Sequence, residues 1–425
     1  MFNIDRHQLQ IEGVLATELA KTYGTPLYVY SETKLLSQLN IIESAFLSKY
    51  PNTHAAYACK AFCTKYICKL LEDKGFWLDV VSGGELFTAM AASFPADRIE
   101  FNGNNKSSEE LVMALEYGVA RIVVDNLDEL SHLEALCKSH NKTTKILFRI
   151  TPEVKATTHD YISTGQKDSK FGIPLDESIL FPAIERAIKS EVLEFLGFHF
   201  HVGSQLQEVQ THINALEVAL KLLLETKKRF GYSVKDLNVG GGFGIRYTEA
   251  DDPLVLSDFL DPIMERVESY CEEHQLVRPH ISIEPGRFIV GESGVQLYTI
   301  GNIKEIPNTR TYVSVDGGMT DNIRPGLYGA NYHALIANKA DLPKTSLVTI
   351  SGKCCESTDI LIKDLYLPKP ERNDVLVVFS TGAYGYSMAN NYNKLQIPAV
   401  VVVNGNEHRL IVKRQSYEAM IANEV

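Results

Sequence analysis

Residues 55–61 read Ala-Ala-Tyr-Ala-Cys-Lys-Ala, a short apolar run that ends in a lysine. The run has the composition of a buried β-strand and places Lys60 where that strand should end. A lysine at the mouth of an apolar pocket loses solvation, so its amine can become neutral and form a Schiff base with an aldehyde cofactor. Lys60 is therefore a candidate covalent anchor. A surface lysine whose stem lies along apolar neighbours is the alternative.

The same order of elements recurs from about residue 54 to residue 286. An apolar, β-rich run is followed by a polar or glycine turn and then by an amphipathic helical stretch. Ser107 and Glu110 have the spacing of a capping box, and Gly118 and Gly231 are helix stop signals. The predicted strands are residues 54–59, 77–81, 99–102, 121–124, 145–150, 195–200, 236–239 and 280–283. Eight such units predict an α/β fold, a (β/α)8 TIM barrel over residues 33–287.

The pattern changes after about residue 288 to alternating polar and apolar residues with frequent turns. This predicts a separate, mainly antiparallel β domain made by residues 1–32 and 288–425. An early extended segment, residues 26–30, is expected to join it. The other predicted strands of this domain are residues 311–315, 347–350, 374–378, 399–403 and 408–412.

Composition narrows the possible partners and the compartment. The chain has 425 residues and a formal net charge of -11, with no block of Lys or Arg that could neutralise nucleic acid or an anionic membrane. It has no signal-peptide pattern and no apolar run long enough to span a bilayer. Its seven cysteines lack a C-x-x-C spacing, which favours reduced thiols. We therefore expect a cytoplasmic protein with a small-molecule ligand and without nucleic-acid or membrane partners.

The chemically distinctive residues fall at the predicted carboxyl ends of barrel strands, where active sites of such barrels lie. Gly240, Gly241 and Gly242 would let backbone N–H groups approach a phosphate, although a tight turn without a ligand has the same sequence. A dinucleotide-binding turn is excluded, because position 245 is isoleucine. Glu284 could keep a pyridine nitrogen protonated, or be a structural carboxylate paired with Arg287. Lysine, phosphate cradle and acid together indicate pyridoxal phosphate.

Three further interpretations stay open. His199 and His201 would point to the same side of a strand, and such a pair also occurs in metal-dependent hydrolases with a barrel fold. The second interpretation is a carrier of the cofactor without catalytic activity, which would give the polar loops of the β domain no role. The long polar segment 151–172 reads as a cover over the site, with plain disorder as the alternative.

Taken in order, these segments resemble the fold type III pyridoxal-phosphate decarboxylases, which have an alanine racemase-like barrel. The likeness runs from about residue 28 to residue 417. The pieces that carry it are Asp-Val-Val-Ser-Gly-Gly-Glu at 79–85, residues 159–165, His-Val-Gly-Ser-Gln at 201–205, Glu-Pro-Gly-Arg at 284–287, residues 324–328, Cys-Glu-Ser at 355–357 and residues 382–386.

The resemblance implies roles for individual residues. Lys60 would carry the cofactor, His201 would stack on its ring, and Glu284 would meet its ring nitrogen. Cys355 would be the proton donor, supplied by the partner subunit of a head-to-tail homodimer, and no metal is implied. The implied cofactor-binding set is Lys60, Asp79, His201, Ser204, Gly240, Gly241, Gly242, Glu284, Gly286, Arg287 and Tyr384. The implied substrate-binding set is Arg287, Arg324, Tyr328, Glu356 and Tyr384.

The implied reaction is removal of a carboxylate from an amino acid. Glu356 would bind a distal ammonium and an arginine a distal carboxylate, which favours a substrate that carries both groups at its far end. Decarboxylases of ornithine, arginine, carboxynorspermidine or a D-lysine type substrate are the alternatives. Two departures from the family pattern are Phe62, where many relatives have asparagine, and Cys354, a second thiol beside the implied donor.

Overall fold

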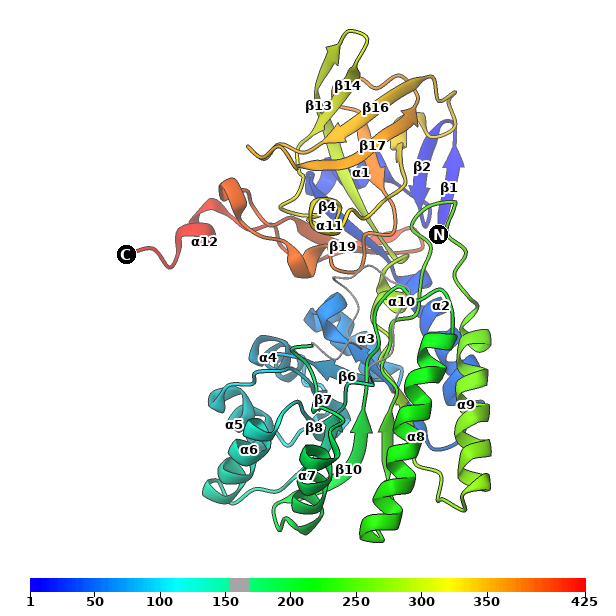
Figure 1. Cartoon of the computed structure of the whole chain (residues 1–425). Helices are drawn as coiled ribbons and strands as arrows, with labels where there is room; N and C mark the ends of the chain where they lie inside the picture. The colour runs from blue at the N-terminus through cyan, green and yellow to red at the C-terminus, as the bar shows by residue number, and fades with distance from the viewer. Residues whose placement is uncertain (153–168) are drawn as a thin grey trace. The chain divides into compact units, whose positions relative to one another are not determined.

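The computed structural model describes residues 1–152 and 169–425. These residues form two compact units (Figure 1). The barrel unit consists of Asn40–Gly244 and Pro253–Gly286, and the β domain of Met1–Leu39, Ile245–Asp252 and Arg287–Val425. Most of the predicted cover, 151–172, lies outside the described residues.

The barrel unit is a closed ring of eight parallel strands, counted over the described residues. Each strand pairs with the next along the chain, and the last pairs with the first, so the predicted TIM barrel is confirmed. The observed strand ends differ from the predicted ones by no more than two residues. The strands are β5 (Thr53–Ala58), β6 (Trp77–Val80), β7 (Ile99–Phe101), β8 (Arg121–Val124), β9 (Thr144–Arg149), β10 (Leu193–His199), β11 (Asp236–Asn238) and β12 (His280–Ile283).

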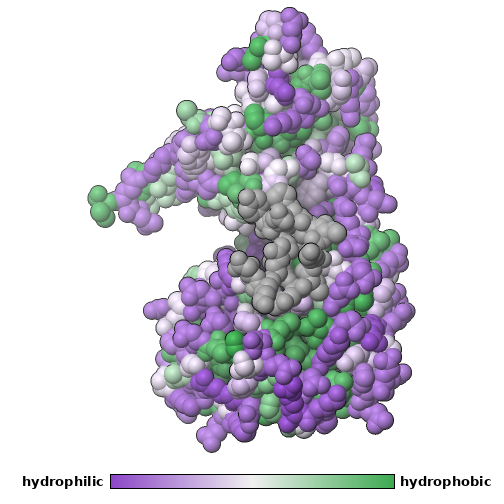
Figure 2. Space-filling view, in the orientation of Figure 1, coloured by the Kyte–Doolittle hydropathy of each residue, from purple (hydrophilic) through white to green (hydrophobic). Residues whose placement is uncertain are grey.

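Helices follow the strands and carry the predicted boundary chemistry. Ser107 and Glu110 form a complete capping box at the start of helix Ser108–Tyr117, which ends at Gly118. Helix Gln210–Phe230 ends at Gly231, and both glycines have left-handed backbone conformations. Hydrophilic side chains dominate the visible surface, interrupted by smaller apolar areas (Figure 2). The barrel helices are α3 (Lys65–Asp73), α4 (Gly83–Ala91), α5 (Ser108–Tyr117), α6 (Leu127–Ser139), α7 (Glu177–Lys189), α8 (Gln210–Phe230) and α9 (Leu256–Glu273). A further helix, α2 (Glu32–Ile42), precedes the first barrel strand, and most of it belongs to the β domain.

The β domain is built around a long strand, β13 (Gly294–Ile306), which pairs with β4 (Leu27–Ser31), β14 (Arg310–Val315) and β18 (Val375–Val378). Most pairs are antiparallel, as predicted, but β4 with β19 (Ala399–Asn404) and β14 with β16 (Ser346–Ser351) are parallel. The early segment 26–30 thus joins this sheet. The other strands are β1 (Phe2–Asp5), β2 (Gln8–Ile11), β3 (Val14–Leu15), β15 (Ala334–Ile336), β17 (Ile360–Leu367) and β20 (Glu407–Val412).

Short helices complete the β domain, namely α1 (Ala16–Tyr23), α10 (Arg287–Val290), α11 (Arg324–Tyr328) and α12 (Tyr417–Ile421). Its core includes Leu27, Val29, Val295, Leu297 and Val401, which come from three adjacent strands. None of the described helices combines the length and apolarity needed to cross a bilayer.

Candidate active site

The inside of the barrel is unusually polar. Such barrels normally fill their interior with branched apolar side chains. Here Asp79 on β6, Glu100 on β7 and Asn238 on β11 are all buried, as is Glu284 directly after β12. Buried carboxylates require hydrogen-bond partners, and these side chains supply them to one another. These buried polar side chains therefore form a connected cluster inside the barrel.

Glu284 is the residue on which this cluster converges. Asn102 and Asn238 donate to its Oε1 from their Nδ2 atoms, at 3.1 and 3.0 Å. His199 brings Nε2 to 2.9 Å of the same oxygen, a close charge contact. All three of these contacts fall on the same carboxylate oxygen, Oε1.

The two acids at the barrel mouth have opposite pKa shifts. Burial would raise the pKa of Glu284, but the charge and contact of His199, followed by the charge of Lys60, lower it to about 2. Burial, reinforced by the charge of Glu284, instead raises the pKa of Asp79 well above its usual value. Asn102 donates to Asp79 Oδ1 at 2.6 Å. Glu284 is thus the ionised member of the pair, as its predicted role at a pyridine nitrogen requires.

Lys60 and His201 lie in the same neighbourhood. Lys60 is exposed in the short 3-10 turn Cys59–Ala61 that ends β5, and its charge acts on Asp79, Glu284 and His201. Burial, together with the nearby charge of Lys60, lowers the pKa of His201 well below its usual value. The imidazole is therefore neutral at pH 7, which suits a ring that stacks on an aromatic cofactor.

The glycine turn after β11 forms a backbone cradle. Gly240 and Gly242 have φ angles of 71° and 100°, which favour glycine. A side chain on any of the three glycines would run into a backbone carbonyl, namely that of Phe200, Glu284 or Gly203. Gly203 precedes Ser204 in the loop between β10 and α8. A Cβ at Gly286 would likewise lie 3.0 Å from the Cβ of Ala58, beside Lys60. These close approaches fit a phosphate-binding turn.

A second layer of charges lies deeper in the barrel. Glu100 accepts from Asn238 Nδ2 at 2.9 Å and contacts His54 Nε2 at 2.8 Å. Arg121 pairs closely with Asp236 and brings Nε to 3.5 Å of Glu100. Burial opposes ionisation of Glu100, yet Arg121 and His54 lower its pKa. The Glu100 carboxylate is therefore held ionised beneath the site.

In the β domain, two predicted substrate residues meet around one tyrosine. Arg287 Nη1 donates to the Tyr247 hydroxyl, and Arg324 Nη1 donates to the same hydroxyl at 3.1 Å. The Arg287 guanidinium also lies 4.8 Å from the centroid of the Tyr384 ring, and Arg324 donates to Tyr332. We call these five residues the arginine cluster. Both arginines are buried, and the described contacts of the Arg324 guanidinium are with Tyr247 and Tyr332 rather than with a carboxylate, so it is suited to bind an anionic group.

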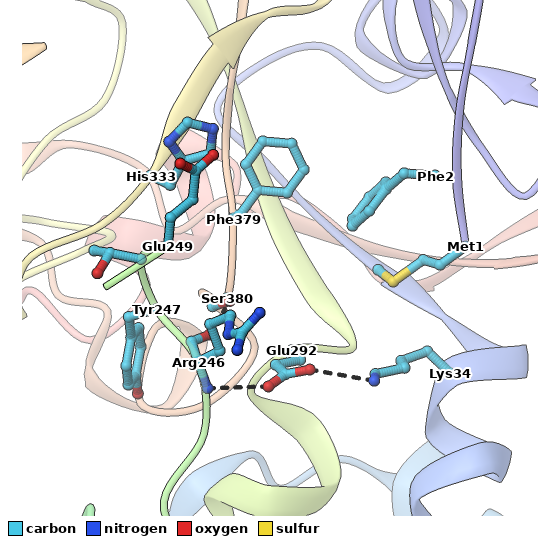
Figure 3. A pocket seen from close by; sticks show the side chains of 11 residues that line it. Met1, Phe2, Lys34, Arg246, Tyr247, Glu249, Glu292, His333, Phe379 and Ser380 are labelled. Atoms are coloured by element: carbon cyan, nitrogen blue, oxygen red, sulfur yellow. Dashed lines mark hydrogen bonds and ion pairs between the residues drawn. The ribbon is translucent and has the colours of Figure 1, made fainter. Parts of the chain in front are cut away.

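A cavity of about 330 Å³ adjoins the arginine cluster within the β domain (Figure 3). The Tyr247 side chain lines this cavity, while its hydroxyl binds both arginines. In one wall of the cavity, Lys34 Nζ lies 3.2 Å from Glu292 Oε2, and the backbone N–H of Arg246 donates to Glu292 Oε1 at 3.0 Å. The charges of this wall are therefore paired.

The remaining predicted residues lie elsewhere in the β domain. Tyr328 is the last residue of α11, and Cys355 and Glu356 are exposed in the turn between β16 and β17. Glu356 accepts from Thr358, and this contact lowers its pKa. Cys354, the residue before Cys355, is partly buried, and this burial together with Asp359 raises the pKa of its thiol to about 11. Cys355 is thus the exposed thiol of the pair.

Sequence reasoning missed several residues of the site. Asn102, Asn238, Tyr247 and Tyr332 have no motif of their own and become visible through the contacts of Glu284 and the arginines. His199 and His201 were considered as a pair of metal ligands, but in the structure His199 contacts Glu284. Residues 1–152 and 169–425 contain no group of three or more His, Cys, Asp or Glu arranged to hold a metal ion.

A parallel barrel whose mouth holds a lysine, an ionised glutamate, a neutral histidine and a glycine cradle defines the class of pyridoxal-phosphate-dependent enzymes. Comparison with known proteins agrees with this assignment. The family model "Pyridoxal-dependent decarboxylase, pyridoxal binding domain" matches residues 36–291.

Curated relatives match over nearly the whole chain. The diaminopimelate decarboxylase of Bacillus subtilis (strain 168) is 50% identical over 97% of this chain and 94% of its own length. That of Bacillus methanolicus is 49% identical over 97% and 95%. The crystal structure of diaminopimelate decarboxylase from M. jannaschii, in complex with L-lysine, covers 100% of this chain and 98% of its own, with 35% identity and a TM-score of 0.94. The chain belongs to the pyridoxal-dependent decarboxylase family.

Proposed function

We propose that this protein decarboxylates meso-2,6-diaminopimelate to L-lysine and carbon dioxide, the final step of lysine biosynthesis. The observation that carries the proposal is the full-length similarity to diaminopimelate decarboxylases. Similarity over the β domain matters most, because the substrate-binding residues implied by the resemblance come mainly from that domain. A metal-dependent hydrolase is not favoured by any of these relatives.

The residues of the barrel mouth fit pyridoxal phosphate. Lys60 would hold the cofactor covalently, the cradle of Gly240 to Gly242 with Ser204 would bind its phosphate, and Glu284 would contact its ring nitrogen. When bound, the cofactor supplies an electron sink for the electron pair that carbon dioxide leaves behind. The ionised Glu284 would keep a proton on the ring nitrogen, and His201 would pack its neutral ring beside the cofactor.

The arginine cluster suits the far end of diaminopimelate. Its guanidinium groups are fixed by the Tyr247 hydroxyl, so they lose little freedom when a carboxylate binds between them. Glu356 would take the distal ammonium. Ornithine has no distal carboxylate, so it would leave a buried arginine without an anion, which disfavours its binding.

Proton return is assigned to Cys355. The thiol is exposed, which suits a group that serves the active site of a partner subunit in a homodimer. Cys354 is a weaker candidate, because its raised pKa and its contacts with Asp359 and Thr320 commit it to the fold. Replacement of Cys355 by alanine should reduce turnover and leave the bound chromophore unchanged. Full activity in that variant would move the role elsewhere.

A reducing compartment is the proposed location. Each of the seven cysteines lies in the described part of the chain and is a free thiol, which supports the cytoplasm.

The function is tested by supplying the purified, cofactor-saturated protein with meso-diaminopimelate or with ornithine. We expect lysine and carbon dioxide from the first and little amine from the second. Faster release of amine from ornithine would replace the proposal with a basic amino acid decarboxylase. Borohydride reduction followed by peptide mapping should label Lys60, and a protein that stays colourless and unlabelled would overturn the cofactor assignment.

A further inference from the structure

Asn238, the last residue of β11, makes hydrogen bonds that the proposed function does not use. The side chain is fully buried. Its Nδ2 donates to Glu284 Oε1 at 3.0 Å and to Glu100 Oε2 at 2.9 Å, while its Oδ1 accepts from the Gly240 N–H at 2.9 Å. One amide therefore joins the carboxylate expected at the ring nitrogen to the turn expected at the phosphate.

These partners allow the amide a single orientation. Both of its N–H donors face carboxylate oxygens, and its carbonyl oxygen faces an N–H group. If the amide were flipped, its oxygen would face two carboxylates and its NH₂ would face a donor. Asn238 is thus a rigid link and not an interchangeable polar filler.

Glu100 gives the link a fixed support. Its carboxylate is fully buried and contacts Arg121 and His54, so its position is set independently of the site. Arg121 is in turn paired with Asp236, the residue two positions before Asn238 on the same strand. The support beneath Asn238 therefore consists of paired charges that cannot move separately without leaving one of them unpaired.

We propose that Asn238 is a positioning residue that holds Glu284 and the glycine turn in fixed register, so that ring nitrogen and phosphate of the cofactor are seated together. Pyridoxal phosphate presents these two groups at separate points of the molecule, and a side chain that links both receiving groups sets the seat of the whole ring. The inference rests on the proposed function only through the cofactor, whichever amino acid is the substrate.

The test compares Asn238→Asp with a matched control, Asn338→Asp. Asn338 in the β domain makes a similar but smaller set of contacts: its Nδ2 donates to one carboxylate, that of Asp374, at 2.7 Å, and its Oδ1 accepts from the Val375 N–H at 3.1 Å. Asn338→Asp places a second carboxylate beside Asp374 at a partly buried position, whereas Asn238→Asp places a third beside Glu284 and Glu100 in a fully buried one, so the folding of each variant is checked by thermal unfolding before cofactor binding is compared. Only Asn238 touches the proposed cofactor site.

Two quantities are measured on each protein. The first is the dissociation constant of pyridoxal phosphate from the apo form, followed by fluorescence. The second is the ¹⁵N chemical shift of the ring nitrogen of labelled cofactor, which reports directly whether that nitrogen carries a proton.

Asn238→Asp retains an oxygen for the Gly240 N–H but puts another carboxylate oxygen against Glu284 and Glu100. We expect cofactor binding to weaken about 10- to 100-fold, because a hydrogen bond to a charged group is lost. The new carboxylate would repel Glu284 and replace the donor that holds its Oε1, so Glu284 would move away from the ring nitrogen. We therefore also expect the ¹⁵N signal to move toward the unprotonated position, while Asn338→Asp keeps the wild-type values. A folded Asn238→Asp variant with the wild-type ¹⁵N shift would overturn the proposal.

A second variant covers the case in which Asn238→Asp does not fold. Asn238→Ala adds no charge and removes the links to Glu284 and to Gly240 together. It should weaken cofactor binding and broaden or move the ¹⁵N signal, and wild-type values in this variant would refute the inference. If the wild-type protein binds the cofactor but does not decarboxylate diaminopimelate, the proposed substrate fails and the inference about Asn238 stands.

Discussion

Replacement of Gly241 by alanine is a direct test of how closely the glycine turn approaches Glu284. Gly241 does not have a positive φ, so alanine is allowed by its backbone conformation. Its methyl group would nevertheless lie 2.8 Å from the carbonyl carbon of Glu284, and closer still to the carbonyl oxygen. We therefore expect steric contact with Glu284 to be the main cause of any effect.

The size of the effect follows from these distances. Carbon atoms rest about 3.5–4.0 Å apart, so the two chain segments must separate by roughly an ångström. Overpacking of this kind costs about 1–3 kcal/mol of stability. Glu284 would move away from Asn102 and Asn238, and a displacement of that size at a reacting centre can reduce the rate about 100-fold.

The assay is kcat/KM for carbon dioxide release, together with thermal unfolding of the apo protein. Gly301→Ala on β13 is the control, because Gly301 also lacks a positive φ and the nearest atom to its added methyl, the Ser314 carbonyl oxygen, is 3.6 Å away. The control should keep the wild-type rate. If Gly241→Ala also keeps it, the position of Glu284 does not depend on this turn and the account of the site is wrong.

Three further predictions concern stability. In a urea titration, Arg121→Met should lower the free energy of unfolding by about 3–5 kcal/mol, because Glu100 and Asp236 lose a buried partner. The control Arg186→Met removes a half-exposed pair with Glu134 and should cost less than about 1 kcal/mol in the same titration. Ser107→Ala should cost about 1 kcal/mol by removing the cap of α5, and a null effect in chemical denaturation would show that the capping box does not limit stability. Burial raises the pKa of Asp321 to about 7, so the unfolded state ionises first and the contribution of Asp321 to stability should fall by up to about 4 kcal/mol as pH rises from about 4 to 7. Wild type minus Asp321→Asn should show this slope in the pH dependence of the free energy of unfolding, and an unchanged slope in the variant would contradict the assignment.

Most of the barrel could be predicted because its signals are local. Each strand is a short apolar run, and its helix begins or ends at a residue with a known preference, such as Ser107 or Gly231. The strands of the β domain were harder to predict from the sequence. Strand β13 is its longest element but is interrupted by Gly301 and Asn302 and has no regular alternation, so it was not predicted. Strand β13 pairs with β4 and β18, which are distant in the sequence, and this pairing defines it as a strand.

The residues of the site also fall into those with a local sequence signal and those without one. Lys60, Glu284 and the glycine turn carry distinctive residue types at strand ends, and they were identified from the sequence. Asn238 and Tyr247 are ordinary residues in ordinary segments. Their importance comes from partners more than 35 residues away along the chain, such as Glu284 for Asn238 at a separation of 46 and Arg324 for Tyr247 at 77. A single sequence contains no local pattern for such convergence.

The polar barrel interior has a consequence for engineering this enzyme. A hydrocarbon core accepts many exchanges as long as volume is conserved, whereas an interior built from Glu100, Arg121, Asp236 and Asn238 accepts only exchanges that conserve donors, acceptors and charge. Thermostabilising substitutions should therefore be sought on the outer helices and in the β sheet. Random repacking libraries aimed at the barrel axis should be dominated by inactive or unfolded members.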